Sequence, residues 1–155
     1  MDFEELVRAV QSLNAEDAFR ARLDVQQWRT LSSYLTHHEV PRGTELIREG
    51  EVDRSVYFLA QGSLQMFRRD VAPGAPRVVM LRPGSVVGEN GLFSGAPHTA
   101  SIEAMTAAHV WALRLPRFEE LCSRMPTLAL EVLRGVGGVM SARTRTYQGR
   151  QAAVV

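Results

Sequence analysis

The chain has 155 residues, of which 45% are hydrophobic, which is enough for one domain with a buried core and too few for two. Its 18 basic and 17 acidic residues give a net charge of +1, so no strong overall field attracts it to nucleic acid or to an acidic membrane. The N-terminus is acidic rather than basic, no apolar run reaches the ~18 residues of a membrane span, and there is one cysteine, Cys122. We therefore expect a soluble cytoplasmic protein of a single domain, residues 1–155.

Residues 1–38 are predicted to form two or three short helices. Apolar residues recur at helical spacing from Phe3 to Val10, and again from Val25 to Leu35. Asn14 or Asp17 is the predicted N-cap of one of these helices, because short polar side chains can accept a hydrogen bond from a free amide at a helix start.

Residues 39–115 are predicted to be all β. The apolar period shortens to about two, in short runs that glycine and proline interrupt, including a turn at 73–76. Many short strands at regular spacing indicate a sandwich or roll. The expected strands are Glu45–Arg48, Ser55–Ala60, Ser63–Arg69, Arg77–Arg82, His98–Met105 and His109–Leu115.

Helical spacing returns over residues 116–147, where Pro116 and Pro126 suit the first turns of two successive helices. An apolar stripe on the second helix can pack either on the roll or against a twin helix, and it consists of Leu128, Val132, Val136, Val139 and Met140. Residues 148–155 are predicted to be a tail that is too short to form a recognition helix, so we expect no sequence-specific binding of nucleic acid.

Three glycines in this last helix, Gly135, Gly137 and Gly138, call for an explanation. Each costs roughly 1 kcal/mol relative to alanine inside a helix. Close backbone contact with a partner would justify them, and a frayed or kinked helix is the alternative.

No catalytic or metal-binding constellation is found in the sequence. His37, His38, His98 and His109 lack the His-x-His spacing of a metal site on a β-roll, and His37 and His38 are expected at the surface. Cys122 has no nearby histidine and is expected to be a small core residue. We predict no enzyme activity, no catalytic residue and no metal, with a metal-dependent enzyme on a similar roll as the remote alternative.

The segment 87–102 is the candidate binding site. Gly88 permits close backbone approach, and Glu89 can accept hydrogen bonds from a diol. The amides of Asn90, Gly91 and Leu92 would open a short helix whose positive end suits a phosphate. In the alternative interpretation, the two glycines only turn the chain and Glu89 is a surface acid.

Ordered motifs surround this segment: Leu-Ile-Arg-Glu-Gly at 46–50, Val-Tyr-Phe-Leu-Ala-Gln-Gly-Ser at 56–63, and Leu-Arg-Pro-Gly-Ser-Val-Val-Gly-Glu-Asn-Gly-Leu-Phe at 81–93. With them, residues 28–145 closely resemble the cyclic-nucleotide-binding domain family, which includes the sensor domain of the bacterial catabolite activator protein. The resemblance implies an α+β, mainly β, fold. It would have an eight-stranded, jelly-roll-like β-roll flanked by N-terminal helices and a long C-terminal helix, with 87–102 as the phosphate-binding cassette.

The resemblance also implies roles for individual residues. In the family the cassette glycine and the amides after it, here Gly88, Asn90 and Gly91, meet the cyclic phosphate, and the acid matching Glu89 takes the ribose hydroxyl. An arginine followed by a serine or threonine clamps the phosphate. The positions that match this clamp are His98 and Thr99. Those that match the purine pocket are Met66, Val78 and Leu81. Those that match the base contacts of the last helix are Arg143 and Thr144.

His98 therefore departs from the family pattern. A hydrogen bond to a charged group is worth roughly 1.5 to 3 kcal/mol, so loss of the guanidinium would weaken binding by about 10- to 150-fold. Histidine has no bidentate fork and is mostly neutral at pH 7, although a nearby phosphate favours its charged form. Two alternatives stay open. His98 is either a functional residue, as a softer and pH-dependent phosphate contact or an adaptation to another ligand, or an exposed residue in a pocket no longer used.

These observations predict a non-enzymatic regulatory or sensor module that binds cAMP, cGMP or a cyclic dinucleotide, with no further cofactor. We expect a homodimer through the C-terminal helix, a possible protein partner, and no association with membranes. The main alternative is a degenerate domain that binds no nucleotide and acts as a dimeric protein-interaction module. A third alternative is a piece of a DNA-binding regulator.

Overall fold

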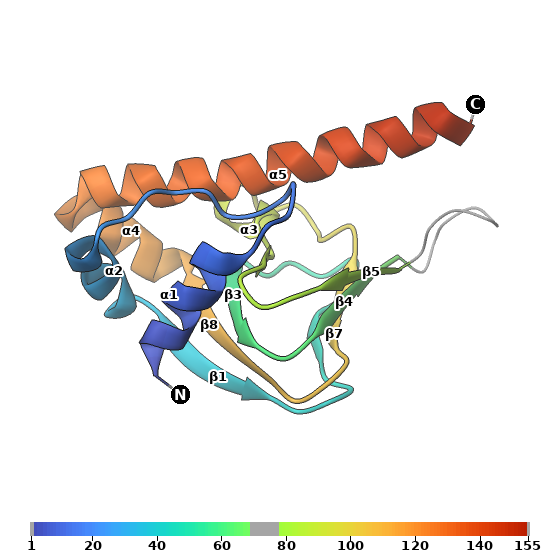
Figure 1. Ribbon diagram of the computed structural model, residues 1–155. Coiled ribbons are helices and arrows are strands. Elements are labelled where there is room, and N and C mark those ends of the chain that lie inside the picture. Colours follow the sequence, from blue (N-terminus) through green and yellow to red (C-terminus); the bar gives the residue numbers. More distant parts are fainter. Residues whose placement is uncertain (1, 69–77, 155) are drawn as a thin grey trace.

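In the computed structural model, which describes residues 2–68 and 78–154, eight antiparallel strands form two four-stranded sheets (Figure 1). The order in the first sheet is β1 (Thr36–Val40), β8 (Ala108–Arg114), β3 (Ser55–Gln61) and β6 (Val86–Val87). In the second sheet the order is β2 (Glu45–Ile47), β7 (Ser101–Ala104), β4 (Leu64–Phe67) and β5 (Val78–Leu81). The predicted α+β fold with an eight-stranded roll is confirmed.

The sequence missed two of these strands, β1 and β6. Strand β1 carries Thr36, His37, His38 and Glu39, so it lacks the apolar alternation that predicts a strand. Strand β6 has only two residues. The strand expected from His98 starts three residues later, at Ser101. The predictions for Arg69, Arg77 and the turn at 73–76 lie outside the described residues.

The predicted helix caps at Asn14 and Asp17 are wrong. Helix α1 (Phe3–Ser12) is capped by Asp2, whose carboxylate accepts from the Glu4 amide at 3.2 Å. Helix α2 (Val25–Ser32) begins with a capping box, in which the Asp24 carboxylate accepts from the Gln27 amide at 2.7 Å and the Gln27 side chain accepts from the Asp24 amide at 3.0 Å. Asn14 and Asp17 lie between the helices, in residues 13–24, which we call the N-terminal strap.

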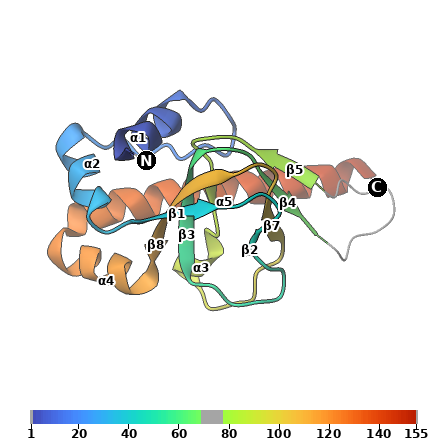
Figure 2. The same ribbon diagram turned by 90° about the horizontal axis from the view of Figure 1, so that it is seen from below.

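Two helices follow the roll, α4 (Leu115–Arg124) and α5 (Pro126–Val154), with Pro116 in the first turn of α4 and Pro126 at the start of α5, as predicted. Helix α5 thus continues past residue 147, where the sequence predicted a tail, and it extends beyond the sheets (Figures 1 and 2). Four residues of the predicted stripe are buried in the domain's own core, and Met140 is half-buried. The stripe therefore packs on its own roll.

Strand β3 separates two hydrophobic cores. Val56 and Phe58 point to the core formed with the helices, and Tyr57 and Leu59 point to the core inside the roll. Because both faces of β3 are covered, Ser55 to Ala60 are all buried and the strand is a continuous apolar run.

Cys122, which the sequence placed in the core, is exposed. No helix in the described part of the chain is long and apolar enough to cross a membrane.

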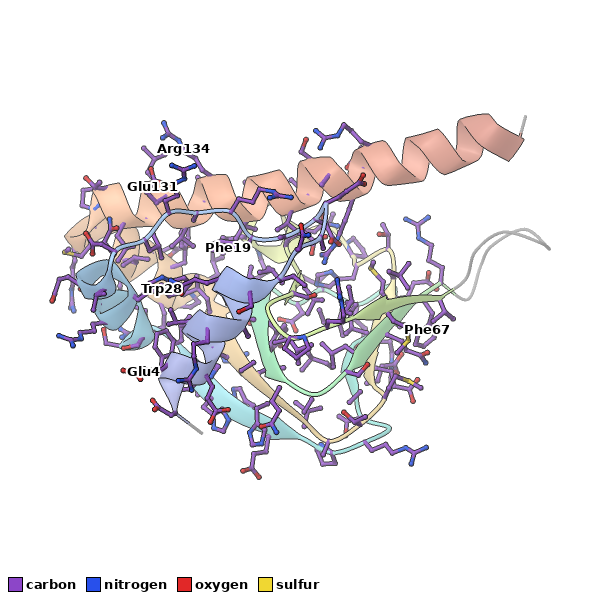
Figure 3. All side chains as sticks on the ribbon, in the orientation of Figure 1. Glu4, Phe19, Trp28, Phe67, Glu131 and Arg134 are labelled. Atoms are coloured by element: carbon purple, nitrogen blue, oxygen red, sulfur yellow. The ribbon has the colours of Figure 1, made fainter. Side chains whose placement is uncertain are left out.

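Gly135 is explained by a contact within the chain. The strap passes along α5, and Phe19 from the strap lies beneath this helix (Figure 3). A Cβ atom on Gly135 would lie 2.3 Å from Cε2 of Phe19, so the buried phenyl ring occupies the space that a larger residue would need. Gly138 has open space where its Cβ would be.

Candidate functional site

The segment 87–102 borders a small cavity of about 40 Å³ between the roll and α5. Of the residues that the sequence singled out, those that line it are Met66, Gly88, Glu89, Asn90, His98, Thr99 and Arg143. The lining is completed by residues to which the sequence analysis gave no individual role, Ile47, Val87, Ala100 and Ile102. Gly91, Val78, Leu81 and Thr144 are not part of it.

Two glycines let the cassette pack directly on the chain at residues 53–55. Gly88 has a φ of +78°, and a Cβ there would lie 2.6 Å from the main-chain oxygen of Ser55. A Cβ on Gly91 would lie 2.4 Å from the main-chain oxygen of Asp53. Both positions therefore require glycine, and this fixes the path of the backbone at the cavity.

Side chains hold the cassette on the same segment, which sequence reasoning missed. Arg54 donates from Nε to the carbonyl oxygen of Gly91 at 2.8 Å. The Asp53 carboxylate accepts from the Ser55 amide at 3.0 Å and from the Tyr57 hydroxyl at 2.7 Å. Burial, followed by the hydrogen bond to Asp53, raises the pKa of Tyr57 to about 12. Asp53 thereby anchors the turn that supports the cassette.

Glu89 turns its carboxylate into the cavity and is not a surface acid. Its side chain is 15% exposed, and Oε2 lies 2.8 Å from Nη1 of Arg143 on α5. The Nε of the same arginine lies 3.0 Å from Oδ2 of Asp17 in the strap. One guanidinium therefore joins the cassette, α5 and the N-terminal strap.

The amides of the cassette turn are only partly free. Helix α3 (Asn90–Phe93) is a single turn, in which the Gly91 amide donates to Gly88 at 3.0 Å and the Leu92 amide donates to Glu89 at 3.3 Å. Among the described residues, no acceptor is found for the amides of Glu89 and Asn90. A ligand anion would therefore meet these two amides rather than those of Gly91 and Leu92.

His98 is buried, with 6% of its surface exposed, and this corrects the alternative that placed it in solvent. Its Nε2 lies 2.8 Å from the main-chain oxygen of Asp53. Because a carbonyl oxygen only accepts, Nε2 carries the proton, and Nδ1 of the neutral ring is then an acceptor. The backbone of His98 is held as well, through hydrogen bonds with Gly50 at 2.8 Å and Glu51 at 2.9 Å.

The residues matched to the purine pocket and the base contacts are dispersed. Val78 is half exposed on the outer side of β5, whereas Leu81 is buried opposite Leu64 in the core of the roll. Val79 pairs with Met66 and packs with it against the roll core, so the inward position of β5 is one residue beyond Val78. Thr144 is exposed and donates to the carbonyl of Met140 on its own helix.

The structure also joins two histidines that lie far apart in the sequence. Nε2 of His37 on β1 lies 2.9 Å from Nδ1 of His109 on β8, and both residues are half-buried. Burial, together with the nearby His109, lowers the pKa of His37. The part of the chain that the structure describes contains no group of three or more side chains suited to hold a metal ion.

Comparison with known proteins agrees with this geometry. The family model for the cyclic nucleotide-binding domain matches residues 37–125, which include most of the roll, the cassette and α4. The chain belongs to the cyclic nucleotide-binding domain family. Of the described site, only the strap and α5 lie outside the matched range.

Similar members of this family include a channel and a transcription factor. The chain is 35% identical over 90 residues to a cyclic nucleotide-gated potassium channel of Mesorhizobium japonicum, covering 58% of this chain and 23% of the channel. It is 28% identical over 107 residues to the cAMP-activated global transcriptional regulator CRP of Salmonella typhimurium, covering 66% of this chain and 51% of the regulator. This cyclic nucleotide-binding domain thus spans about half of the regulator and less than a quarter of the channel.

A solved structure shares the fold over nearly the whole chain. It is a cyclic nucleotide-binding domain from Methylobacillus flagellatus, with a TM-score of 0.83 and 22% sequence identity. The match covers 99% of this chain and 84% of the other. The arrangement of roll and helices described above is therefore one that occurs in an experimental structure.

Proposed function

We propose that this chain is a non-enzymatic regulatory or sensor module that binds a cyclic nucleotide, cAMP, cGMP or a cyclic dinucleotide, between the cassette and α5. The observation that carries the proposal is the half-buried carboxylate of Glu89, which lines the cavity beside the Gly88 turn. Burying a carboxylate is costly unless it has a partner, and in this closed structure the partner is Arg143 on α5. Glu89 can accept hydrogen bonds from sugar hydroxyls, and the free amides of Glu89 and Asn90 can donate to a phosphate.

The described conformation is closed. Pockets for ligands of this size begin at roughly 300 Å³, whereas this cavity measures about 40 Å³. Arg143 is among the residues that line the cavity, and it is held in place by Glu89 and Asp17. A ligand must therefore move this side chain or α5, and ligand binding would shift the helix through this contact.

We also propose that the phosphate site is weakened at His98. Nε2 donates to the main-chain oxygen of Asp53, so the remaining ring nitrogen of a neutral His98, Nδ1, is an acceptor and not a donor. Only a doubly protonated ring could donate to a phosphate from Nδ1. The cassette itself therefore contributes main-chain amides and no guanidinium to the binding of an anion.

Calorimetric titration of the purified chain with cAMP, cGMP and cyclic-di-GMP tests the proposal. We expect heat of binding with at least one of them, and its loss in Glu89→Ala. Glu119→Ala, on the far helix α4, is the matched control and should bind as the wild type does. Absence of binding with all three nucleotides would contradict the proposed function.

One observation favours a second function, a degenerate domain that serves as a dimeric protein-interaction module. The Arg143–Glu89 ion pair occupies the position that a ligand needs, as it would in a site that has lost its ligand.

For either function we propose a cytoplasmic homodimer through α5. This helix presents Leu130 on its exposed side, with 47% of the residue's surface accessible. Sedimentation equilibrium of the wild type and of Leu130→Glu tests the dimer, which the substitution should dissociate.

A further inference from the structure

Arg143 is the central residue of the closed site. Its side chain is 14% exposed and bridges two carboxylates that lie 72 residues apart in the sequence, Glu89 in the cassette and Asp17 in the strap. It uses Nη1 for Glu89 and Nε for Asp17. Two of the three guanidinium nitrogens are therefore occupied.

The third nitrogen is not satisfied. Nη2 of Arg143 is buried and has no hydrogen-bond partner in the described part of the chain. Buried polar groups are nearly always hydrogen-bonded, and a charged N–H without an acceptor is especially unfavourable. Because Arg143 lines the cavity, a ligand acceptor placed there can complete its hydrogen bonding.

The other charged or titratable groups that line the cavity do not attract an anion. Glu89 is negative, and His98 presents an acceptor when its ring is neutral. Among the described residues, Arg143 contributes the single guanidinium of the lining. An anionic ligand group in this cavity must therefore be bound by Arg143 and by main-chain amides.

We propose that Arg143 supplies from α5 the phosphate-binding guanidinium that the cassette lacks at position 98. This inference rests on the proposed function. In the bound state, Nη1 and Nη2 form a fork that holds two phosphate oxygens, the geometry in which arginine binds phosphates best. Glu89, released from Nη1, accepts from a sugar hydroxyl of the same ligand.

The proposal gives Asp17 a positioning role. Nε stays on Asp17 while the two Nη atoms change partner from Glu89 to the phosphate. The guanidinium therefore stays tethered to the strap when it or α5 moves to admit the ligand, and the strap becomes part of the binding site. A phosphate ester with a neighbouring hydroxyl satisfies both Arg143 and Glu89, whereas a ligand without a phosphate leaves Nη2 unpaired.

Calorimetry with cAMP, cGMP and adenosine on Arg143→Gln tests the assignment. If Arg143 binds the phosphate, Arg143→Gln lowers the affinity for the preferred cyclic nucleotide by about tenfold or more. It does not weaken the binding of adenosine, which has no phosphate, and it reduces the dependence of affinity on salt. Adding His98→Arg to Arg143→Gln should restore part of the lost affinity.

The matched control is Arg134→Gln, because Arg134 lies on the exposed side of α5 near Glu131 (Figure 3) and should leave binding unchanged. Cyclic-nucleotide binding that stays the same or becomes tighter in Arg143→Gln would overturn the assignment and leave Arg143 as a plug, while the proposed function stands. If the wild type binds none of the cyclic nucleotides, the proposed function fails and this inference fails with it. Asp17→Asn, which leaves both Nη atoms in place, should cause a smaller loss than Arg143→Gln.

Discussion

The imidazole of His98 donates from Nε2 to the main-chain oxygen of Asp53, 2.8 Å away. This hydrogen bond attaches the cassette to the turn that begins at Asp53. The Asp53 carboxylate also binds the Tyr57 hydroxyl, and the next residue, Arg54, also binds the cassette, so His98 has a structural partner inside the domain. The same bond fixes which ring nitrogen carries the proton. The side chain that the family resemblance assigned to phosphate binding thus stabilises the cassette that would bind the ligand.

Replacing His98 with arginine should strengthen the binding of a cyclic nucleotide. The guanidinium adds charge-assisted hydrogen bonds of roughly 1.5 to 3 kcal/mol, which corresponds to a gain of about tenfold or more in affinity. Calorimetric titration of wild type and His98→Arg measures the difference. His98→Gln, which is neutral, is the control and should show no gain. Equal affinities of His98→Arg and wild type would contradict a weakened phosphate site.

Two glycines in α5 should respond in opposite ways to substitution by alanine. Gly138→Ala adds helix propensity in open space and should raise the free energy of unfolding by about 0.5 to 1 kcal/mol. Gly135→Ala forces a methyl group against the buried Phe19 ring and should lower it by roughly 1 to 3 kcal/mol. Urea denaturation gives both values. A stabilised Gly135→Ala variant would show that the strap does not pack on α5 as described.

The pair His37 and His109 should make the fold sensitive to acid. The pKa of His37 is lowered by burial and by His109, so below about pH 6.5 the unfolded chain binds the proton more readily than the folded chain does. The stability is therefore complete above this pH and declines as the pH falls. The melting temperature, followed by circular dichroism from neutral to acidic pH, should fall less steeply in His37→Gln than in the wild type. His38→Gln is the neighbouring control, and an equal effect of both substitutions would contradict this account.

The sequence predicted those parts of the fold that depend on local chemistry. The turn at Gly88 requires a positive φ, and the strand β3 and the stripe of α5 have clear apolar periods, so each could be recognised without a partner. The sequence also placed Arg143 near the site, but only through the family resemblance. Nothing in its neighbourhood indicates that it contacts Glu89 or that it closes the cavity.

The errors come from contacts between distant segments. Asp17 is a suitable cap by residue type, but in the fold its carboxylate binds Arg143, 126 residues away. On β5, several consecutive apolar residues leave the inward face undefined, and only pairing with β4 shows that Val79 rather than Val78 points inward. In both cases the local pattern fits more than one arrangement, and the tertiary partner decides.

Tyr57 should control stability at alkaline pH. Its pKa is raised to about 12 by burial and by its hydrogen bond to Asp53, so the unfolded chain, in which tyrosine ionises near pH 10, loses its proton first. Stability should therefore fall as the pH rises from about 10 toward 12. Tyr57→Phe should remove part of this alkaline loss, and at neutral pH it should cost roughly 1.5 to 3 kcal/mol, because the buried ring stays but the bond to the carboxylate is lost. Urea denaturation at neutral and alkaline pH measures both effects.

The control is Tyr34→Phe, which removes the hydroxyl of another buried tyrosine, away from Asp53. If this variant lost as much free energy of unfolding as Tyr57→Phe, the bond to Asp53 would not be the cause.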